Sequence, residues 1–326
     1  MFANSALNSF LQNRDGIALH DKHVINPLLD HIEKSYSGIA AGSSNNVGIV
    51  QLKDFVLEEY LQHDTLCIIA EISKVVERSD MFKNFIVHGS CSDFRIVDGW
   101  SDFDCIAVVK RSSLSRRNRF DLLKVCVELD EKMRTLDPYQ HHGIHYIHED
   151  ELLSFPNLYL PVDVLRSGKC VLSNGKLEIC RVDSLHLEVS RFRSVLETLR
   201  LASESGVLRH HAKDGKFLKE NYEDADTMYQ LKYLISLISL LPAYWCNMSG
   251  LYCEKPQAYA EMRKQFSPDQ LEFFEKCSDV RFGWKRHFHD SNIIHEDVMN
   301  ILGSDYLLRA YRFARLLNEF PRAKND

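Results

Sequence analysis

The residues best suited to chemistry lie in one stretch, residues 85–109. A short apolar run at residues 85–87 leads into Gly89 and Ser90, and a second apolar run at residues 105–109 is preceded by Asp102 and Asp104. Glycine lets the backbone approach a phosphate closely, and a serine hydroxyl together with exposed backbone N–H groups can hold that phosphate. Mg²⁺ prefers oxygen ligands and often combines one or two carboxylates with substrate phosphates. These residues therefore predict a site for a divalent cation and a phosphorylated ligand.

The spacing of the two aspartates supports this interpretation. We expect residues 101–109 to form a strand, in which alternate side chains face the same side, so Asp102 and Asp104 would lie about 6–7 Å apart on one face. That arrangement allows a shared pair of cations about 3.5–4 Å apart, which can activate an attacking hydroxyl and neutralise a leaving pyrophosphate. A Gly-Ser pair alone is better explained as a turn, and an Asp-x-Asp alone as a solvated strand end. Their order and their flanking strands together favour function.

The surrounding pattern predicts the elements that would position these residues. Strands are expected at residues 85–87, 101–109 and 143–147, with a turn at Asp98-Gly99 and a helix over residues 120–136. Helical spacing also appears within residues 50–76, where we expect one or two helices, and residues 162–172 suggest a short helix and a strand. The fold class expected for this part is α/β (α+β) with a small mixed sheet.

From about residue 181 onward, helical periodicity dominates the sequence. Helices are expected over residues 185–199, 228–241 and 306–320, and Ser267, Pro268 and Gln270 form a helix start with an N-cap serine. The C-terminal part is therefore expected to be an all-α helical bundle. The predicted domains are an N-terminal extension at residues 1–50, the α/β domain at residues 51–180 and the helical domain at residues 181–326.

The motif resembles that of the DNA polymerase β-type nucleotidyltransferase superfamily. The resemblance rests on HGS at residues 88–90 and DFD at residues 102–104, each joined to an apolar strand, and covers about twenty residues as a motif and about a hundred with the flanking elements. It implies that Asp102 and Asp104 bind metal, either Mg²⁺ or Mn²⁺, and that Gly89 and Ser90 hold the β- and γ-phosphates of a nucleoside triphosphate, most simply ATP.

The C-terminal half adds a second resemblance. The stretch SGLYCEKPQAYAEM at residues 249–262, with the following helix and residues 281–287, is similar to the helical domain of aminoglycoside nucleotidyltransferases. In that family a lysine at this kind of position reaches the triphosphate, and Lys255 is the matching residue. The resemblance implies that the helical domain completes the substrate cleft.

One position departs from the superfamily pattern. A third carboxylate usually lies on the next strand, whereas this strand, HHGIHYIHEDEL, offers His145 at the matching position. A histidine there could act as a general base or could simply fill space in the strand. Glu149, Asp150 and Asp163 are less well placed. The departure leaves open a non-catalytic nucleotide-binding module.

Composition excludes several classes of protein. Of the 326 residues, 45% are hydrophobic and 26% are charged, which is typical of a globular chain, and the net charge of -6 argues against general coating of nucleic acid such as DNA. Nine cysteines without a CxxC pair predict reduced thiols in a cytoplasmic protein. The first residues lack the features of a signal peptide, and no apolar run is long enough to span a bilayer, so no membrane is expected.

Three charged or histidine-rich clusters each have a simple structural explanation beside a functional one. A zinc site at His141, His142, His145 and His148 is disfavoured because the spacing matches no common site. A basic run is usually a solvated loop, but its place after the metal strand would also suit phosphate or RNA: Lys110, Arg111, Arg116, Arg117 and Arg119. An acidic run is best explained as a helix start, with a pocket for a cationic substrate as the alternative: Glu220, Glu223, Asp224 and Asp226.

The function expected from the sequence is therefore transfer of a nucleoside monophosphate from a nucleoside triphosphate to an acceptor hydroxyl. The acceptor stays open between a small molecule such as an aminoglycoside, which suits the helical half, and a tRNA end or a protein hydroxyl as in toxin-like members of the superfamily. The alternative of a different class is the non-catalytic nucleotide-binding module. The catalytic candidates are Asp102, Asp104 and His145, and the nucleotide-binding candidates are Gly89, Ser90 and Lys255.

Overall fold

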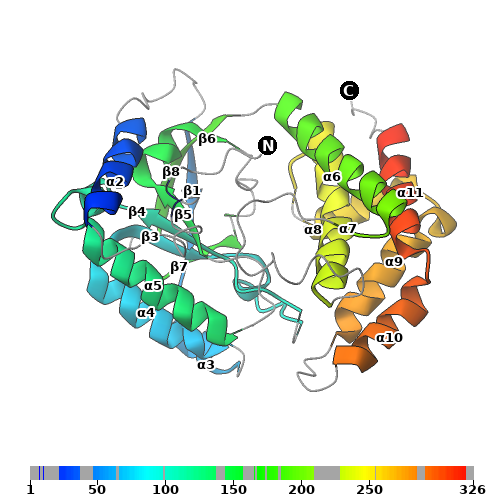
Figure 1. Cartoon of the computed structure of the whole chain (residues 1–326), viewed down its shortest axis with the longest axis horizontal. Coiled ribbons are helices and arrows are strands. Elements are labelled where there is room, and N and C mark those ends of the chain that lie inside the picture. Colours follow the sequence, from blue (N-terminus) through cyan, green and yellow to red (C-terminus); the bar gives the residue numbers. More distant parts are fainter. Residues whose placement is uncertain are drawn as a thin grey trace. The chain divides into compact units, whose positions relative to one another are not determined.

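The structure is a computed structural model that describes residues 7, 10, 22–36, 47–63, 66–97, 100–136, 144–156, 165, 167–172, 175–182, 185–208, 228–253, 255–284 and 291–320. The chain forms two compact units (Figure 1). The first unit contains Met1–Ile96 and Ser101–Asp183, and the second contains Val97–Trp100 and Ser184–Asp326. The N-terminal region is thus mixed α/β, and the described part of the C-terminal region is helical.

A five-stranded mixed sheet forms the centre of the first unit. Its strand order is β2-β7-β3-β4-β5, with β2 at Lys53–Asp54, β7 at Lys169–Cys170, β3 at Phe82–Val87, β4 at Cys105–Val109 and β5 at His145–His148. The pairs β3–β4 and β3–β7 are antiparallel, whereas β4–β5 and β2–β7 are parallel. Every residue of β4 is buried, as expected for an apolar central strand. Because Val87 pairs with Cys105, the last residue of β3 lies beside the first residue of β4 at one end of the sheet's strands.

Helices cover one face of this sheet. Helices α4 (Ile68–Ser79) and α5 (Arg119–Leu136) pack against each other there, as Figure 1 shows, and share a core with the side chains of Phe85, Ala107 and Tyr146. On α4 the buried side chains include Ile69, Ile72, Val75 and Val76, which are spaced three and four residues apart and form one apolar stripe. A short helix, α3 (Leu57–Leu61), precedes α4 and contributes Tyr60 to the same core.

The N-terminal helix α2 (Lys22–Tyr36) belongs to the same unit. Its buried residues Ile25, Leu29, Ile32 and Tyr36 recur at helical spacing and join the core beneath α4 and α5. Arg119, at the start of α5, is fully buried and pairs with Asp30 at 2.8 Å and with Glu33 at 3.2 Å. The sequence offered no clear element here, because the polar residues of α2 obscure its apolar stripe.

A second sheet covers the other face. Strand β8 (Lys176–Val182) pairs antiparallel with β1 (Val47–Gln51) and parallel with β6 (Phe155–Pro156). Val50, Leu177 and Ile179 from this sheet pack with Ile86 and Ile106 from the central one. The first fifty residues thus contribute both a helix and a strand to the first unit.

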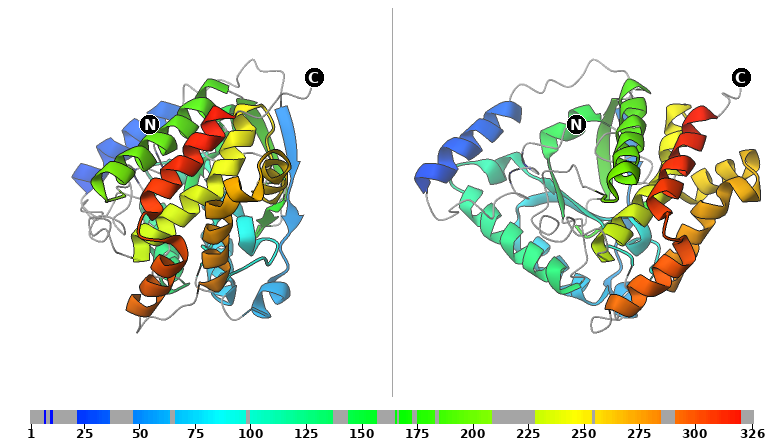
Figure 2. Two further views of the ribbon diagram at one scale, coloured as in Figure 1. Left: turned by 90° about the vertical axis from the view of Figure 1, so that its right-hand side faces the viewer. Right: turned by 45° about the vertical axis from the view of Figure 1, so that its right-hand side comes forward.

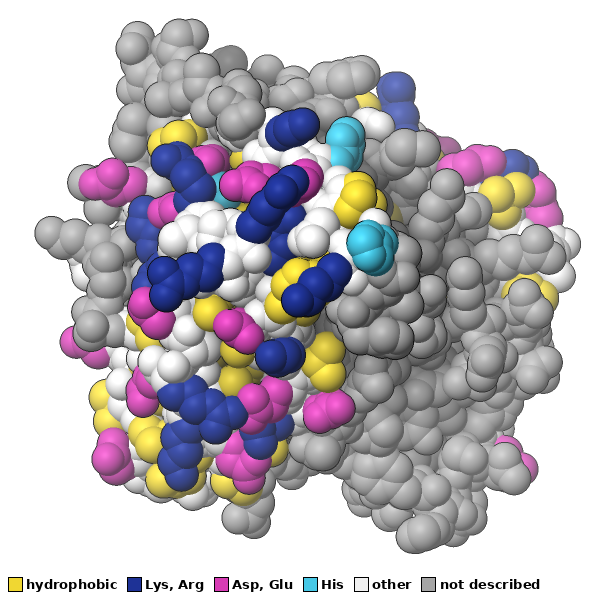
Figure 3. Space-filling model, turned by 60° about the vertical axis from the view of Figure 1, so that its left-hand side comes forward, with side chains coloured by type: hydrophobic (Ala, Val, Ile, Leu, Met, Phe, Trp, Pro, Cys, Tyr) yellow, Lys and Arg dark blue, Asp and Glu magenta, His cyan; other side chains and the backbone are white. Residues whose placement is uncertain are grey.

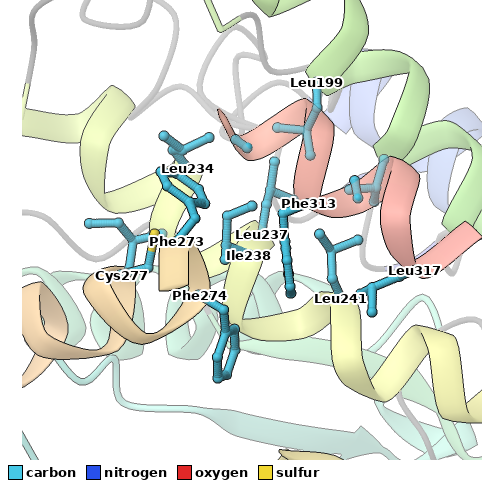
Figure 4. Packing of buried hydrophobic residues seen from close by; sticks show 14 of the residues in the cluster. Leu199, Leu234, Leu237, Ile238, Leu241, Phe273, Phe274, Cys277, Phe313 and Leu317 are labelled. Carbon is cyan, nitrogen blue, oxygen red and sulfur yellow. The ribbon is translucent and has the colours of Figure 1, made fainter. Parts of the chain in front are cut away.

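Helix α7 (Met228–Met248) forms the centre of the second unit. It contacts α6 (Leu185–Ser205), α8 (Lys255–Gln265), α9 (Pro268–Gly283), α10 (Ser291–Leu302) and α11 (Tyr306–Glu319). Most of its side chains from Gln230 onward are buried, which is typical of a helix surrounded by others. Figure 4 shows Leu234, Ile238 and Leu241 of α7 packed with Phe273 and Phe313 from α9 and α11. Figure 2 shows α11 lying along α6, which it also contacts.

A short segment of the motif stretch belongs to this helical core. Val97–Trp100 leaves the first unit, and the Trp100 ring packs edge-to-face on the Trp284 ring with centroids 5.0 Å apart. Trp100 is only 6% exposed. The chain thus returns to the first unit at Ser101, directly before Asp102.

Most predicted elements are confirmed, and their boundaries shift. The strands near residues 85–87 and 143–147 and the helices near residues 120–136, 185–199, 228–241 and 306–320 are present. The predicted helix start is also present: Ser267 accepts a hydrogen bond from Gln270 N, and Pro268 begins α9. Within residues 50–76 the helices begin only at residue 57, because residues 47–54 pair as β1 and β2 instead. Among the described residues, no helix is long and apolar enough to cross a membrane.

Candidate functional site

The Gly-Ser and Asp-x-Asp halves of the motif meet at one end of the central sheet, where β3 finishes and β4 begins. His88 N donates a hydrogen bond to the carbonyl oxygen of Asp104 at 3.0 Å, directly beyond the Val87–Cys105 pair. The Cys91 thiol donates to the carbonyl oxygen of Asp102 at 3.3 Å. Antiparallel pairing of β3 with β4 therefore holds the Gly-Ser loop against the Asp-x-Asp segment, although eleven residues lie between Ser90 and Asp102 in the sequence.

Gly89 lies close to the carboxylate of Asp104. Its backbone has φ +66, and a Cβ atom at this position would lie 2.7 Å from Asp104 Oδ2. The left-handed backbone favours glycine, and a side chain at this position would also force the Asp104 carboxylate to move. The glycine therefore allows the Gly-Ser turn and the Asp104 carboxylate to lie close together.

Ser90 follows in a 3₁₀ turn, Gly89–Cys91, and is half-buried. The turn is closed by Ser92, whose N–H and hydroxyl both donate to the carbonyl oxygen of Gly89, at 3.2 Å and 2.8 Å. A tight turn of this kind points successive backbone N–H groups to one side, which suits an anion.

Asp102 and Asp104 precede the strand and are not part of it. The prediction that residues 101–109 form one strand is wrong for its first four residues, because β4 begins at Cys105. The reason is tertiary: residues 97–100 belong to the second unit, so the returning chain reaches its strand partner only near Asp104. Buried and half-buried side chains nevertheless alternate from Asp102 to Cys105. Phe103 and Cys105 are buried in the core under the helices, whereas Asp102 and Asp104 are half-buried.

Burial and nearby carboxylates raise the pKa values of two thiols beside the motif. Burial raises the pKa of Cys91, and the charges of Asp104 and then Asp102 raise it further. Burial likewise raises the pKa of Cys105, with contributions from Cys91 and Asp104. Both carboxylates thus lie close enough to the Cys91 thiol to act on it electrostatically. Among the described residues, no lysine or arginine forms an ion pair with Asp104.

His145 is the first residue of β5 and neighbours Ile106 in the parallel pair β4–β5. Its neighbours Ile144 and Tyr146 face the core under the helices, so the His145 side chain lies on the opposite face, together with Ile106. It is half-buried, and its Nε2 atom is buried. The prediction that it serves as a base stays a prediction.

The remaining acidic candidates lie elsewhere. Glu149 and Asp150 follow the other end of β5, and Asp163 lies outside the described residues. Lys255 is the exposed first residue of α8 in the second unit, and its predicted contact with a triphosphate stays a prediction. His141, His142 and the acidic run at residues 220–226 are also outside the described residues.

The donor atoms at the motif suit a hard divalent cation. Asp102, Asp104 and Ser90 all offer oxygen atoms, the ligands that Mg²⁺ and Mn²⁺ prefer. Within the described part of the chain, no group of three or more His, Cys, Asp or Glu residues could hold a metal by itself. Two carboxylates are therefore a partial shell that fits a cation whose other ligands are substrate phosphates and water.

The basic run after β4 lies at the opposite end of the sheet. Lys110 pairs with Asp80, and Arg111 pairs with Asp150. Arg116 pairs with Asp30 at 2.7 Å. Figure 3 shows Lys and Arg side chains interspersed with Asp and Glu on one face of the molecule. A shallow depression of about 670 Å³ here is lined by Lys83, Lys110 and Arg111, but also by Glu33 and Glu149. This mixed lining does not make a strongly positive surface.

Sequence reasoning missed two residues beside the Gly-Ser loop. Phe94, five residues after Gly89, has φ +59, and Lys169 of β7 pairs with Val87 directly before the loop. Nothing in the sequence around Lys169 distinguishes it, because it belongs to a strand of only two residues. No family model, curated protein or solved structure matches this chain.

Proposed function

We propose that this chain is a metal-dependent nucleotidyltransferase, which transfers a nucleoside monophosphate from a nucleoside triphosphate to an acceptor hydroxyl. The observation that supports the proposal most is the closeness of the Asp104 carboxylate to Gly89. A left-handed glycine in a Gly-Ser turn lies against one carboxylate of an Asp-x-Asp segment, at the edge where two buried strands meet. That arrangement offers a phosphate cradle and metal ligands in one place.

Each residue has a defined part in the proposed reaction. The backbone N–H groups after Gly89 and the Ser90 hydroxyl hold the terminal phosphates, and Asp102 and Asp104 hold the cations. Bound divalent metal supplies charge neutralisation at the α-phosphate and the leaving pyrophosphate. The protein contributes mainly by positioning, which is the principal requirement in phosphoryl transfer. His145 is the candidate acceptor for the proton of the attacking hydroxyl.

The acceptor we propose is a small hydroxylated molecule, such as an aminoglycoside. The basic run that would have favoured RNA lies at the other end of the central sheet, some 16 Å away along the strands. Its cations Lys110, Arg111 and Arg116 pair with carboxylates of the same unit. A tRNA end or a protein hydroxyl therefore has less support as the acceptor, and the proposed location is the cytoplasm.

The test is transfer of label from each α-labelled nucleoside triphosphate, with Mg²⁺ or Mn²⁺, to an aminoglycoside panel, total tRNA and the protein itself. We expect transfer to a small molecule, and a loss of about 10³-fold in Asp102→Asn and in Asp104→Asn, because charge stabilisation at the reacting phosphate is the main contribution. Asp80→Asn is the matched control: Asp80 is exposed, has a left-handed backbone that asparagine tolerates, and lies at the other end of the sheet.

The other outcomes identify the alternatives. Transfer to tRNA or to protein, lost in the same variants, would replace the proposed acceptor class. Nucleotide binding without transfer to any acceptor would contradict catalysis and favour a non-catalytic module, in which His145 stands in place of a required carboxylate. If no nucleotide binds, the motif itself has been misinterpreted.

A further inference from the structure

The loop that follows Gly89 contains an unusual backbone conformation. Phe94 has φ +59, in the left-handed region that bulky side chains rarely adopt. Such outliers persist only where surrounding contacts hold them, and they gather at ligand-binding and active sites. Phe94 lies five residues after Gly89, at the end of the turn that contains Ser90 and Cys91. Its conformation therefore determines how this turn leaves the sheet.

Three side chains enclose the Phe94 ring. His63 stacks on it with ring centroids 4.9 Å apart, and Tyr60 meets it edge-on at 5.0 Å. The ammonium group of Lys169 lies 4.1 Å from the Phe94 ring centroid and 5.2 Å from that of Tyr60. Both distances are within the range of cation–π attraction, which is strongest when the cation is shielded from water. Lys169 is 7% exposed, so this condition is met.

Lys169 contacts the loop at both of its ends. Its backbone pairs with Val87, which directly precedes His88 and Gly89, and its side chain lies over Phe94. The close approach of β7 to β3 depends on Gly168, where a Cβ atom would lie 2.8 Å from Ile86 Cγ2. Lys169 thus contacts one residue before and one residue after Gly89 and Ser90 in the sequence.

The partners of Lys169 identify it as a positioning residue. Its ammonium group pairs with Glu59 at 2.7 Å, and that carboxylate is half exposed. A lysine that is already paired and largely buried is poorly suited to bind a phosphate. The same features suit it to hold an aromatic ring in place.

We propose that Lys169 is a positioning residue for the nucleotide: by holding Phe94 it keeps the Gly89–Ser90 turn in its phosphate-binding conformation. This inference rests on the proposed nucleotidyltransferase function. When a loop occupies its binding conformation only part of the time, apparent affinity falls by that fraction, while saturating ligand restores the conformation. Loss of the Lys169 charge should therefore raise KM for the nucleoside triphosphate and leave kcat nearly unchanged.

The experiment compares Lys169→Met, Lys169→Arg and the control Lys132→Met in the full chain. Lys132 also pairs with a glutamate, Glu71 at 2.6 Å, but it lies on α5. We expect Lys169→Met to raise KM for the nucleoside triphosphate about tenfold with kcat within about twofold, because a shielded cation–π contact is lost. Lys169→Arg should restore KM to within about twofold, since arginine also stacks on aromatic rings. Lys132→Met should change neither constant.

Amide hydrogen exchange of the same proteins without nucleotide gives a second readout. Lys169→Met should accelerate exchange about tenfold in residues 89–96 and leave β4 and α5 unchanged, because only the loop depends on the contact. An unchanged KM together with unchanged exchange would overturn the inference, and so would acceleration throughout the first unit, which would indicate a merely structural role. If the wild-type protein transfers no nucleotide, the proposed function fails, while local acceleration in residues 89–96 still supports the positioning contact.

Discussion

The charged side chains at the two ends of the central sheet differ in whether they form ion pairs. At the end where β4 and β5 finish, basic and acidic side chains alternate and pair, as between Lys83 and Glu149 at 3.7 Å and between Arg111 and Asp150. At the end where β3 finishes and β4 begins, Asp104 lies close to Gly89, Asp104 and Asp102 both raise the pKa of the buried Cys91 thiol, and no described lysine or arginine forms an ion pair with Asp104. At the paired end, opposite charges neutralise each other. At the motif end, the carboxylates provide negative charge that a cation could neutralise.

We interpret the paired end as a source of stability and the motif end as the candidate functional site. Ion pairs link α2 to the start of α5 and to the turn before it: Arg116 and Arg119 lower the pKa of Asp30 to about 2, chiefly through side-chain hydrogen bonds. Like charges held close to each other have the opposite effect and raise the free energy of the folded state. Proteins accept such costs mainly at functional sites, which is why the motif end is the better candidate.

The largest effect is expected from Arg119→Met at the paired end. Arg119 is fully buried, and its loss would leave Asp30 and Glu33 of α2 without this partner. We expect the free energy of unfolding to fall by about 3 kcal/mol, the lower range for breaking a buried pair, because both carboxylates are partly exposed. Urea unfolding would measure this.

Arg117→Met is the matched control, since Arg117 is exposed at the same helix start. Its unfolding free energy should change by less than about 0.5 kcal/mol. Binding of Mn²⁺ to the folded protein should be the same in both variants as in the wild type. A loss of Mn²⁺ affinity in Arg119→Met would break the comparison, because the two ends of the sheet would then be coupled.

A smaller effect on stability is expected from Gly89→Ala at the motif end. The new Cβ atom would combine a left-handed backbone with a 2.7 Å approach to Asp104 Oδ2. Backbone strain of this kind costs about 1–2 kcal/mol, and displacement of the Asp104 carboxylate should also reduce Mn²⁺ affinity. Thermal unfolding and Mn²⁺ titration would measure the two effects.

Gly250→Ala separates strain from contact. Gly250 also has a left-handed backbone, with φ +78, but nothing lies within 4 Å of its Cβ position. This variant should lose about 1 kcal/mol of stability through strain alone and keep its Mn²⁺ affinity. Equal Mn²⁺ affinity in Gly89→Ala and the wild type would argue against metal at Asp104.

The smallest effect, and the sharpest difference in sign, is expected from neutralising one acid at each end. Without metal, Asp104→Asn should raise the free energy of unfolding by roughly 0.5 kcal/mol or less, because one of two neighbouring negative charges is removed. Asp150→Asn should lower it, because Asp150 pairs with Arg111 and lies 3.4 Å from His148. Added Mg²⁺ should raise the melting temperature of the wild type and of Asp150→Asn but not of Asp104→Asn. A lower stability of Asp104→Asn would place Asp104 among the structural acids.

The sequence by itself determined the local features of this protein. The apolar runs of β3 and β4, the amphipathic helix α5 and the capped start of α9 follow from neighbouring residues, because periodicity and capping act over a few positions. The Gly-Ser and Asp-x-Asp pairs were likewise visible, and their flanking strands predicted that the two would meet.

Only the tertiary structure decided the contacts that complete the site. It placed Asp102 and Asp104 before β4, because the chain between the two pairs joins the core of the second unit through Trp100. It brought Lys169 beside Val87 from eighty-two residues away and put its ammonium group over Phe94. It also assigned the basic run to the opposite end of the sheet. Antiparallel pairing and side-chain packing join residues that are distant in sequence, and no local pattern encodes which partner each residue will meet.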